Sequence, residues 1–241
     1  MPKILDHWTV MPHGPLEEVD DGILTVAGEV AMPLGRFPRR MTVITLDEAR
    51  TAIWSAIALA EPEMARIEAL GRPSFLIVPS DAHRLDARIW KARYPELRVV
   101  TATGARAGVS KVVPVDSTET AWNDPAVRFE TVPGTGGHEG ALTVRRGERL
   151  TLIVNDVIGH VRHPHGLGAR LMARLMGFGV SGPEVPWLIK RRIIRNPARL
   201  ASQFRQWANE PALIRIIVSH GDPIEKAPAA ALRTLADGLD S

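Results

Sequence analysis

The sequence predicts an α/β sandwich folded as a single domain over residues 1–241. Strand-like segments come first, strands and helices alternate in the middle, and helix-like segments dominate the last third. At 241 residues the chain is long enough to bury a hydrophobic core without disulfide staples. The sequence has no repeat, low-complexity tract or linker that would divide it.

In the first half, alternating and β-branched residues predict strands, and proline and glycine mark their ends. A helix is expected at 61–70, because Pro62 lies near its start and Gly71 follows its end. Residues 51–59 fit a strand or a helix, and residues 33–40 read as a positively charged turn. Residues 1–21 are polar and are expected to wrap the surface. The other expected elements are strands at 22–32, 41–46, 75–80 and 97–102 and a helix at 84–93.

The second half predicts a β-rich stretch followed by helices, with one more strand near the end. Arg145-Arg146-Gly147-Glu148 has the composition of a hairpin turn. The strands are expected at 127–132, 140–146, 150–157 and 213–220, and the helices over 164–208 and 225–238. The long helical region is interrupted by residues 179–186 and by Asn196-Pro197.

Composition excludes several kinds of chemistry. The chain has no cysteine, which rules out disulfides, thiolate zinc sites, iron–sulfur clusters and cysteine nucleophiles. Any metal must therefore be held by histidine, aspartate or glutamate. The net charge of +3 gives no argument for a nucleic-acid partner. With no signal-like segment and no apolar run long enough to span a bilayer, the sequence predicts a soluble, cytoplasmic protein.

Metal-competent side chains follow four of the predicted strands. Asp81, His83 and Asp86 come after the strand at 75–80, and His138 follows the strand at 127–132 across a glycine-rich loop. Asp156 ends the strand at 150–157, and His220 ends the last strand. In α/β folds the carboxyl ends of strands are where loops converge on a site. We therefore expect these six residues to form a metal site.

The order of these residues resembles the metallo-β-lactamase-like superfamily, over roughly residues 22–225. The elements of the resemblance are Asp-x-His-x-x-Asp, then Gly-Gly-His, then a strand ending in aspartate and a strand ending in His-Gly. The segment from His83 to Trp90 and on to Tyr94-Pro95 resembles a divergent branch of that superfamily. The resemblance implies a four-layer αββα sandwich that holds one or two divalent metals, most often zinc.

The first motif departs from the family pattern His-x-His-x-Asp-His. Asp81 falls on the first histidine, Leu85 on the aspartate and Asp86 on the last histidine, whereas His83 matches. His138, Asp156 and His220 match the later family ligands. The resemblance implies one site from Asp81, His83 and His138 and a second from Asp86 and His220, with Asp156 shared between them. Oxygen and nitrogen ligands of this kind suit zinc, manganese or iron.

The function that this set implies is metal-dependent hydrolysis of a small-molecule ester, amide or thioester-like bond. His83, His138, Asp156 and His220 would hold metal, and Asp86 would be a further ligand or a catalytic base. One alternative is a non-catalytic binding protein in which Asp81, Leu85 and Asp86 have dismantled the site. Two others within the superfamily are a phosphodiesterase or nuclease and an iron-dependent oxidoreductase.

Several of these residues also have plain structural interpretations. Asp81 fits a helix N-cap, and His160, His163 and His165 fit a solvent-exposed loop as well as extra ligands. The basic residues of the late helices fit a solvated face better than a nucleic-acid surface. We expect residues about 158–210 to form a helical cap over the site. The cap carries an apolar stripe formed by Leu167, Leu171, Met172, Leu175 and Met176. This stripe would pack against the rest of the domain, line a substrate cleft or join two copies of the chain.

Overall fold

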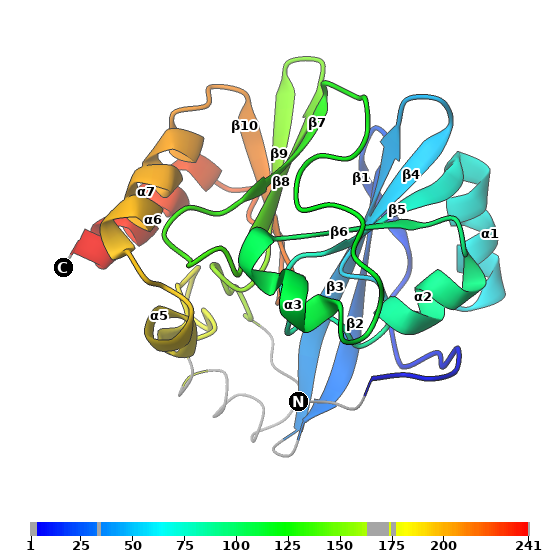
Figure 1. Ribbon diagram of the computed structural model, residues 1–241. Coiled ribbons are helices and arrows are strands. Elements are labelled where there is room, and N and C mark those ends of the chain that lie inside the picture. Colours follow the sequence, from blue (N-terminus) through cyan, green and yellow to red (C-terminus); the bar gives the residue numbers. More distant parts are fainter. Residues whose placement is uncertain (1–3, 33–34, 163–173, 175–176, 241) are drawn as a thin grey trace.

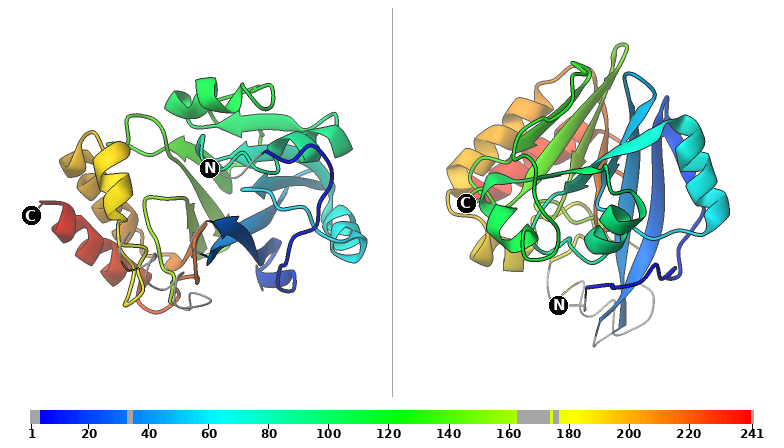
Figure 2. Two further views of the ribbon diagram at one scale, coloured as in Figure 1. Left: turned by 90° about the horizontal axis from the view of Figure 1, so that it is seen from below. Right: turned by 45° about the vertical axis from the view of Figure 1, so that its right-hand side comes forward.

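The computed structural model describes residues 4–32, 35–162, 174 and 177–240. Two β-sheets lie face to face and helices cover their outer sides (Figures 1 and 2). The first sheet has six strands in the order β1-β2-β3-β4-β5-β6, and the second has four in the order β10-β9-β8-β7. This arrangement confirms the predicted αββα sandwich.

Most strands of both sheets are antiparallel, but three pairs are parallel: β4 with β5, β5 with β6, and β9 with β10. The first sheet consists of β1 (Glu17–Asp20), β2 (Ile23–Met32), β3 (Gly35–Leu46), β4 (Arg50–Trp54), β5 (Arg72–Val78) and β6 (Arg98–Thr101). The second consists of β7 (Val127–Thr131), β8 (Gly140–Arg146), β9 (Arg149–Val154) and β10 (Leu213–Val218). The predicted hairpin turn at Gly147 joins β8 to β9, with Gly147 at a φ of 58°.

The helices divide into two groups by the sheet that they cover. The first sheet is covered by α1 (Glu61–Leu70) and α2 (Ala87–Arg93), and α3 (Arg106–Val109) follows β6 after the 3₁₀ turn η1 (Thr103–Ala105). The second sheet is covered by α6 (Pro197–Ala208) and α7 (Pro228–Asp240), while α5 (Trp187–Arg192) precedes α6. Helix α6 begins as its sequence predicts, since Asn196 accepts a hydrogen bond from the Arg199 amide and Pro197 occupies the first turn.

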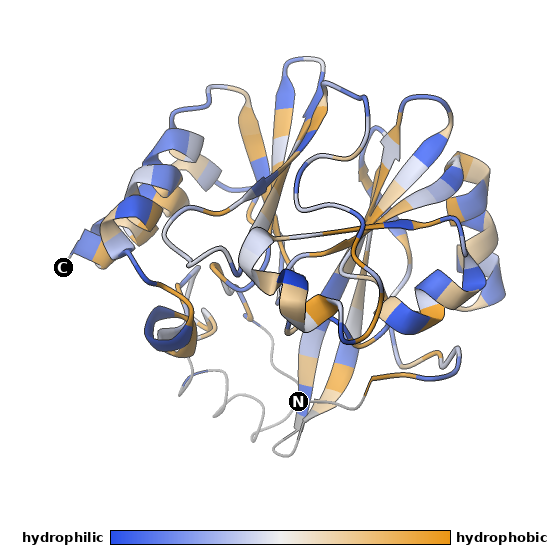
Figure 3. Cartoon of the chain, viewed as in Figure 1, coloured by the Kyte–Doolittle hydropathy of each residue, from blue (hydrophilic) through white to orange (hydrophobic). Residues whose placement is uncertain are grey.

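Three buried clusters stabilise this stack of layers, and they are built from apolar residues of the strands and helices, which Figure 3 colours orange. Between the sheets, Trp54 and Ile77 of the first pack with Leu142 and Ile217 of the second. The outer clusters join each sheet to its helices, and fully buried Trp90 of α2 belongs to one of them. Burying side chains of this size contributes about 1.5–3 kcal/mol each.

The structure corrects the interpretation of residues 33–40 as a turn. Strand β3 already begins at Gly35, and Phe37 pairs with Val30 of β2 in a long hairpin. The positive charges that suggested a turn are compatible with a strand because the Arg39 side chain pairs with Asp86 and the Arg40 side chain donates to Thr25 and to the Gly221 carbonyl. Residues 51–59 also resolve as a strand, β4, followed by extended chain.

Part of the predicted helical cap, residues 163–173 and 175–176, lies outside the described residues. This applies to His163, to His165 and to the whole apolar stripe from Leu167 to Met176. Within the described remainder, α6 packs with α7 against the second sheet. That residues about 158–210 cover the site stays a prediction. No helix in the described part is long and apolar enough to cross a membrane.

Candidate metal centre

Three of the predicted ligands meet where the strands of both sheets end. His83 lies in the turn after β5, Asp156 lies two residues beyond β9, and His220 lies two residues beyond β10. Strand β5 runs parallel to β4 in the first sheet and β9 runs parallel to β10 in the second, and the residues that follow their carboxyl ends converge at one rim of the sandwich. The turns after them therefore bring together residues that are far apart in the sequence.

The donor atoms of this group are close enough to share one ion. Asp156 Oδ1 lies 2.9 Å from His220 Nε2 and 3.3 Å from His83 Nε2. The two Nε2 atoms are 3.2 Å apart. Among the described residues, these three offer one donor atom each, all within 4.8 Å of one another. Two imidazoles and one carboxylate form a ligand set typical of zinc or of non-haem iron.

The other ring nitrogen of each histidine is held by a partner. His220 Nδ1 lies 2.7 Å from the Pro38 carbonyl oxygen, which can only accept, so Nδ1 carries the proton. In the neutral ring, Nε2 then keeps its lone pair for a metal. His83 Nδ1 lies 2.8 Å from the Ser55 hydroxyl. Such partners fix the orientation of metal-binding imidazoles.

The charges of the group stabilise one another. Burial alone would raise the pKa of Asp156, but His83 and His220 outweigh it and hold that pKa far below its usual range. Burial would likewise lower the pKa of His220, yet the Asp156 carboxylate and the Pro38 carbonyl leave it raised. The carboxylate is therefore ionised and available to a cation at neutral pH.

Asp86 lies apart from this group, in an ion pair that the sequence does not predict. It is 1% exposed, contacts Arg39 Nη1 through Oδ2, and accepts a hydrogen bond of 3.0 Å from the Ala58 amide through Oδ1. Both of its oxygens are thus engaged. Arg39 stands on β3, inside the segment read as a turn, so its role could not be seen before the strand was known.

Asp81 and His138 are also absent from the three-residue group of the described structure. Asp81 lies against α3, where a Cβ on Gly108 would be 2.6 Å from the Asp81 Cβ. His138 follows the glycine loop, and its amide donates to the Thr135 carbonyl. A Cβ on Gly136 would lie 3.5 Å from Cδ2 of the His138 ring and 2.9 Å from Cγ of Arg195. Their predicted roles as ligands stay predictions.

A buried polar network supports the Asp156 turn. Glu139 is 0% exposed, and its Oε2 accepts hydrogen bonds from the Asp156 amide at 3.1 Å and from Asn155 Nδ2 at 3.0 Å. Asn155 Nδ2 also donates to Ser80 Oγ. Burial raises the pKa of Glu139 well above its usual value, and the nearby Asp156 charge adds to this. Glu139 is not among the residues predicted from the sequence, although its place directly after His138 was a usable signal.

Aromatic rings and one further histidine surround His220. Phe37 and Phe178 lie 4.9 and 5.8 Å from its ring centroid, and Phe178 also packs edge-on against Phe37. His160 is buried, with Nδ1 on the Asp222 carbonyl and its amide donating to the His220 carbonyl. The predicted solvent-exposed loop is therefore wrong for His160, which helps to position the His220 turn.

Comparisons with known proteins bear on the fold. Family models and curated protein sequences give no match. Among solved structures, the metallo-β-lactamase DIM-1 exposed to ceftazidime matches 95% of this chain and 99% of its own, with a TM-score of 0.63 and 13% identity. The chain has the metallo-β-lactamase fold. The metallo-β-lactamase FIM-1 from Pseudomonas aeruginosa, in its mono-zinc form, matches 95% of this chain and 96% of its own, at a TM-score of 0.61 and 11% identity.

The metallo-β-lactamase fold agrees with the sequence resemblance and explains the position of the group. The match extends over almost the whole chain, so both sheets and their helix layers are included. At 10–14% identity the likeness concerns the fold, and the chemistry must be argued from the residues of this chain.

Proposed function

We propose that the chain is a metal-dependent hydrolase in which His83, Asp156 and His220 hold one divalent metal. The observation that carries the proposal is the convergence of three donor atoms within 4.8 Å on one rim of the sandwich. Three protein ligands leave a coordination position open, as in catalytic rather than structural zinc sites. A metal bound here would act as a Lewis acid and activate water.

The residues of the chain fit such a group. Pro38 and Ser55 orient the two imidazoles, and the carboxylate of Asp156 supplies negative charge against a cation. Phe37 and Phe178 beside His220 exclude water from one side of the group and offer an apolar contact to a substrate. Zinc is the leading metal, and iron or manganese suit the same ligands. The substrate class that we propose is a small-molecule ester, amide or thioester.

A second metal would need ligands that the described structure does not bring to the group. Asp86 would have to leave Arg39, and Asp81 and His138 would have to move toward His83. We therefore propose one metal ion per chain. A measured ratio of two metal ions per chain would instead support the two-metal arrangement.

The non-catalytic alternative rests on one specific observation, the Arg39–Asp86 ion pair. It places a guanidinium on a carboxylate that a two-metal enzyme of this kind would use. A ligand-binding protein with a vestigial site would have the same pair.

Hydrolysis assays separate the two functions. Protein loaded with zinc, manganese or iron would be offered chromogenic esters, amides and thioesters, before and after treatment with a chelator. We expect cleavage that chelation abolishes, that metal restores, and that His83→Ala and His220→Ala lose. His7→Ala, which removes an exposed histidine, should keep full activity. Metal binding without cleavage of any of these bonds would favour the binding protein.

A further inference from the structure

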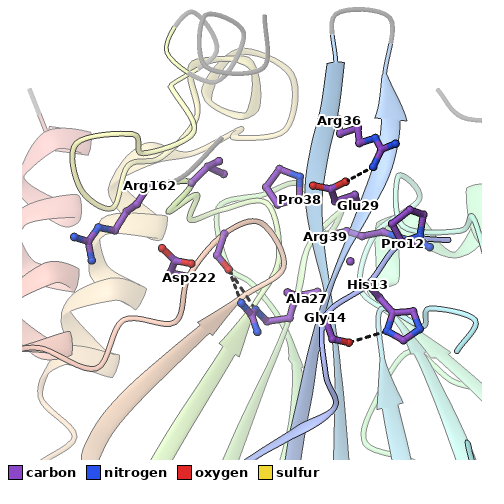
Figure 4. A pocket seen from close by; sticks show the side chains of 14 residues that line it. Pro12, His13, Gly14, Ala27, Glu29, Arg36, Pro38, Arg39, Arg162 and Asp222 are labelled. Atoms are coloured by element: carbon purple, nitrogen blue, oxygen red, sulfur yellow. Dashed lines mark hydrogen bonds and ion pairs between the residues drawn. The ribbon is translucent and has the colours of Figure 1, made fainter. Parts of the chain in front are cut away.

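A cavity of about 520 Å³ lies beside the β2–β3 hairpin (Figure 4). The N-terminal segment 12–14, the two strands and the turns after β9 and β10 form its walls. The charged residues on these walls are Arg36, Arg39, Arg40, Arg162, Glu29 and Asp222. The described walls thus carry four guanidinium groups and two carboxylates.

Two of these arginines already have carboxylate partners. Arg36 pairs with Glu29 at 3.2 Å, and Arg39 pairs with Asp86. The other two, Arg40 and Arg162, have no carboxylate within 4.0 Å in the described part of the chain. Asp222 is the one acidic side chain left on the described walls to face them.

Arg40 is the more informative of the two, because it is only 8% exposed. Its guanidinium donates to the Gly221 carbonyl from Nη2 at 2.9 Å and from Nε at 3.2 Å, and to Thr25 Oγ1 from Nη1 at 3.1 Å. All of these acceptors are neutral. Burial lowers the pKa of Arg40, and the more distant Asp222 and Glu17 counteract this.

All hydrogen-bond partners of Arg40 are neutral, and the charges of Asp222 and Glu17 offset only part of the cost of burying its guanidinium. Three of its five N–H groups are used in these bonds, which leaves donors for an anionic oxygen. Guanidinium groups bind carboxylate and phosphate oxygens through short, charge-assisted hydrogen bonds. Exposed Arg162 stands beside Asp222 at the same cavity (Figure 4).

We propose that this cavity binds the carboxylate or phosphate group of a small molecule, held by Arg40 and Arg162. None of the three candidate metal ligands is among the described residues that line it. It nevertheless adjoins them, because Gly221 follows His220 and the Pro38 carbonyl accepts from the His220 ring. The cavity is thus a neighbouring site that shares no lining residue with the three ligands, and the anion binding proposed for it does not depend on the proposed hydrolase activity.

The test is anion binding to chelator-treated protein, so that no metal competes for the anion. Inorganic phosphate and acetate, each up to about 20 mM, would be titrated separately and followed by amide shifts in NMR spectra. We expect saturable shifts at Gly14, Gly28 and Gly221 with at least one of the two anions. Shifts with phosphate alone would identify a phosphate site, and shifts with acetate alone a carboxylate site.

Substitutions test whether Arg40 and Arg162 bind the anion. Arg162→Gln changes an exposed residue and should weaken binding at least fivefold, and Arg40→Gln should weaken it more. Arg199→Gln removes an equally exposed arginine outside the cavity and should leave the affinity unchanged. If Arg40→Gln fails to fold, the comparison of Arg162→Gln with Arg199→Gln still tests the proposal. No saturation with either anion, or an equal loss in Arg162→Gln and Arg199→Gln, would overturn the proposal.

Discussion

Arg39 of β3 and Asp86 of the turn before α2 form a buried ion pair, with side chains 9% and 0% exposed. The pair joins the long hairpin to the loop that carries His83. Removing one partner of a buried pair leaves an uncompensated charge, which typically costs about 3–5 kcal/mol. We expect Arg39→Met to lower the free energy of unfolding by about that amount, measured by urea denaturation.

The exposed pair between Arg205 and Asp237 supplies the matched control. Arg205→Met should leave the free energy of unfolding nearly unchanged, because surface pairs are screened by solvent. Equal small losses in the two variants would show that the Arg39–Asp86 pair is not the structural link described here.

Ser55 is predicted to tune metal affinity without holding the metal. Its hydroxyl lies 2.8 Å from His83 Nδ1, and loss of such outer partners commonly costs 10- to 100-fold in affinity. Ser55→Ala should therefore weaken zinc binding by about that factor in competition with a chromophoric chelator. Ser74→Ala, whose hydroxyl bonds only to the Arg72 carbonyl among the described partners, should bind zinc like the parent.

Gly221 is predicted to tolerate no side chain. Its φ is +105°, and a Cβ there would lie 2.0 Å from the His160 carbonyl oxygen. Gly221→Ala should destabilise the protein by more than about 1 kcal/mol and displace His220, which lowers zinc affinity as well. Gly238→Ala in α7 meets open space and should be neutral or slightly stabilising. Indistinguishable melting temperatures for the two variants would contradict this account of the turn.

Tyr94 gives a pH-dependent test of the α2 layer, since it is the only tyrosine of the chain. Burial, followed by the hydrogen bond to Glu68, raises its pKa to about 12. Because the folded pKa lies above the unfolded value of about 10, its contribution to stability is complete below pH 10 and is lost as pH rises toward 12. Phenolate absorbance near 295 nm should therefore appear close to pH 12. A midpoint near pH 10 in the folded protein would show that Tyr94 is not held as described.

The sequence predicted the fold, and three of its six candidate ligands are brought together in the described structure. Strand periodicity located both sheets, and the positions of His83, Asp156 and His220 after strands placed them on one rim. Position along the chain cannot show which carboxylate finds a competing partner. Asp86 follows a predicted strand like the other candidates, and the sequence gives no sign that it lies beside Arg39. Ser55 and Pro38 act through a hydroxyl and a backbone carbonyl, which carry no sequence signal.

The central claim is that His83, Asp156 and His220 hold one divalent metal, and metal content tests it most directly. Protein purified without chelator would be analysed by mass spectrometry for zinc, manganese and iron, and melted before and after addition of each metal. We predict one metal per chain, a melting temperature raised by about 10 °C at a thousandfold excess over Kd, and loss of both in His220→Ala. Protein that contains no metal, and whose melting temperature none of the three metals raises, would contradict the claim.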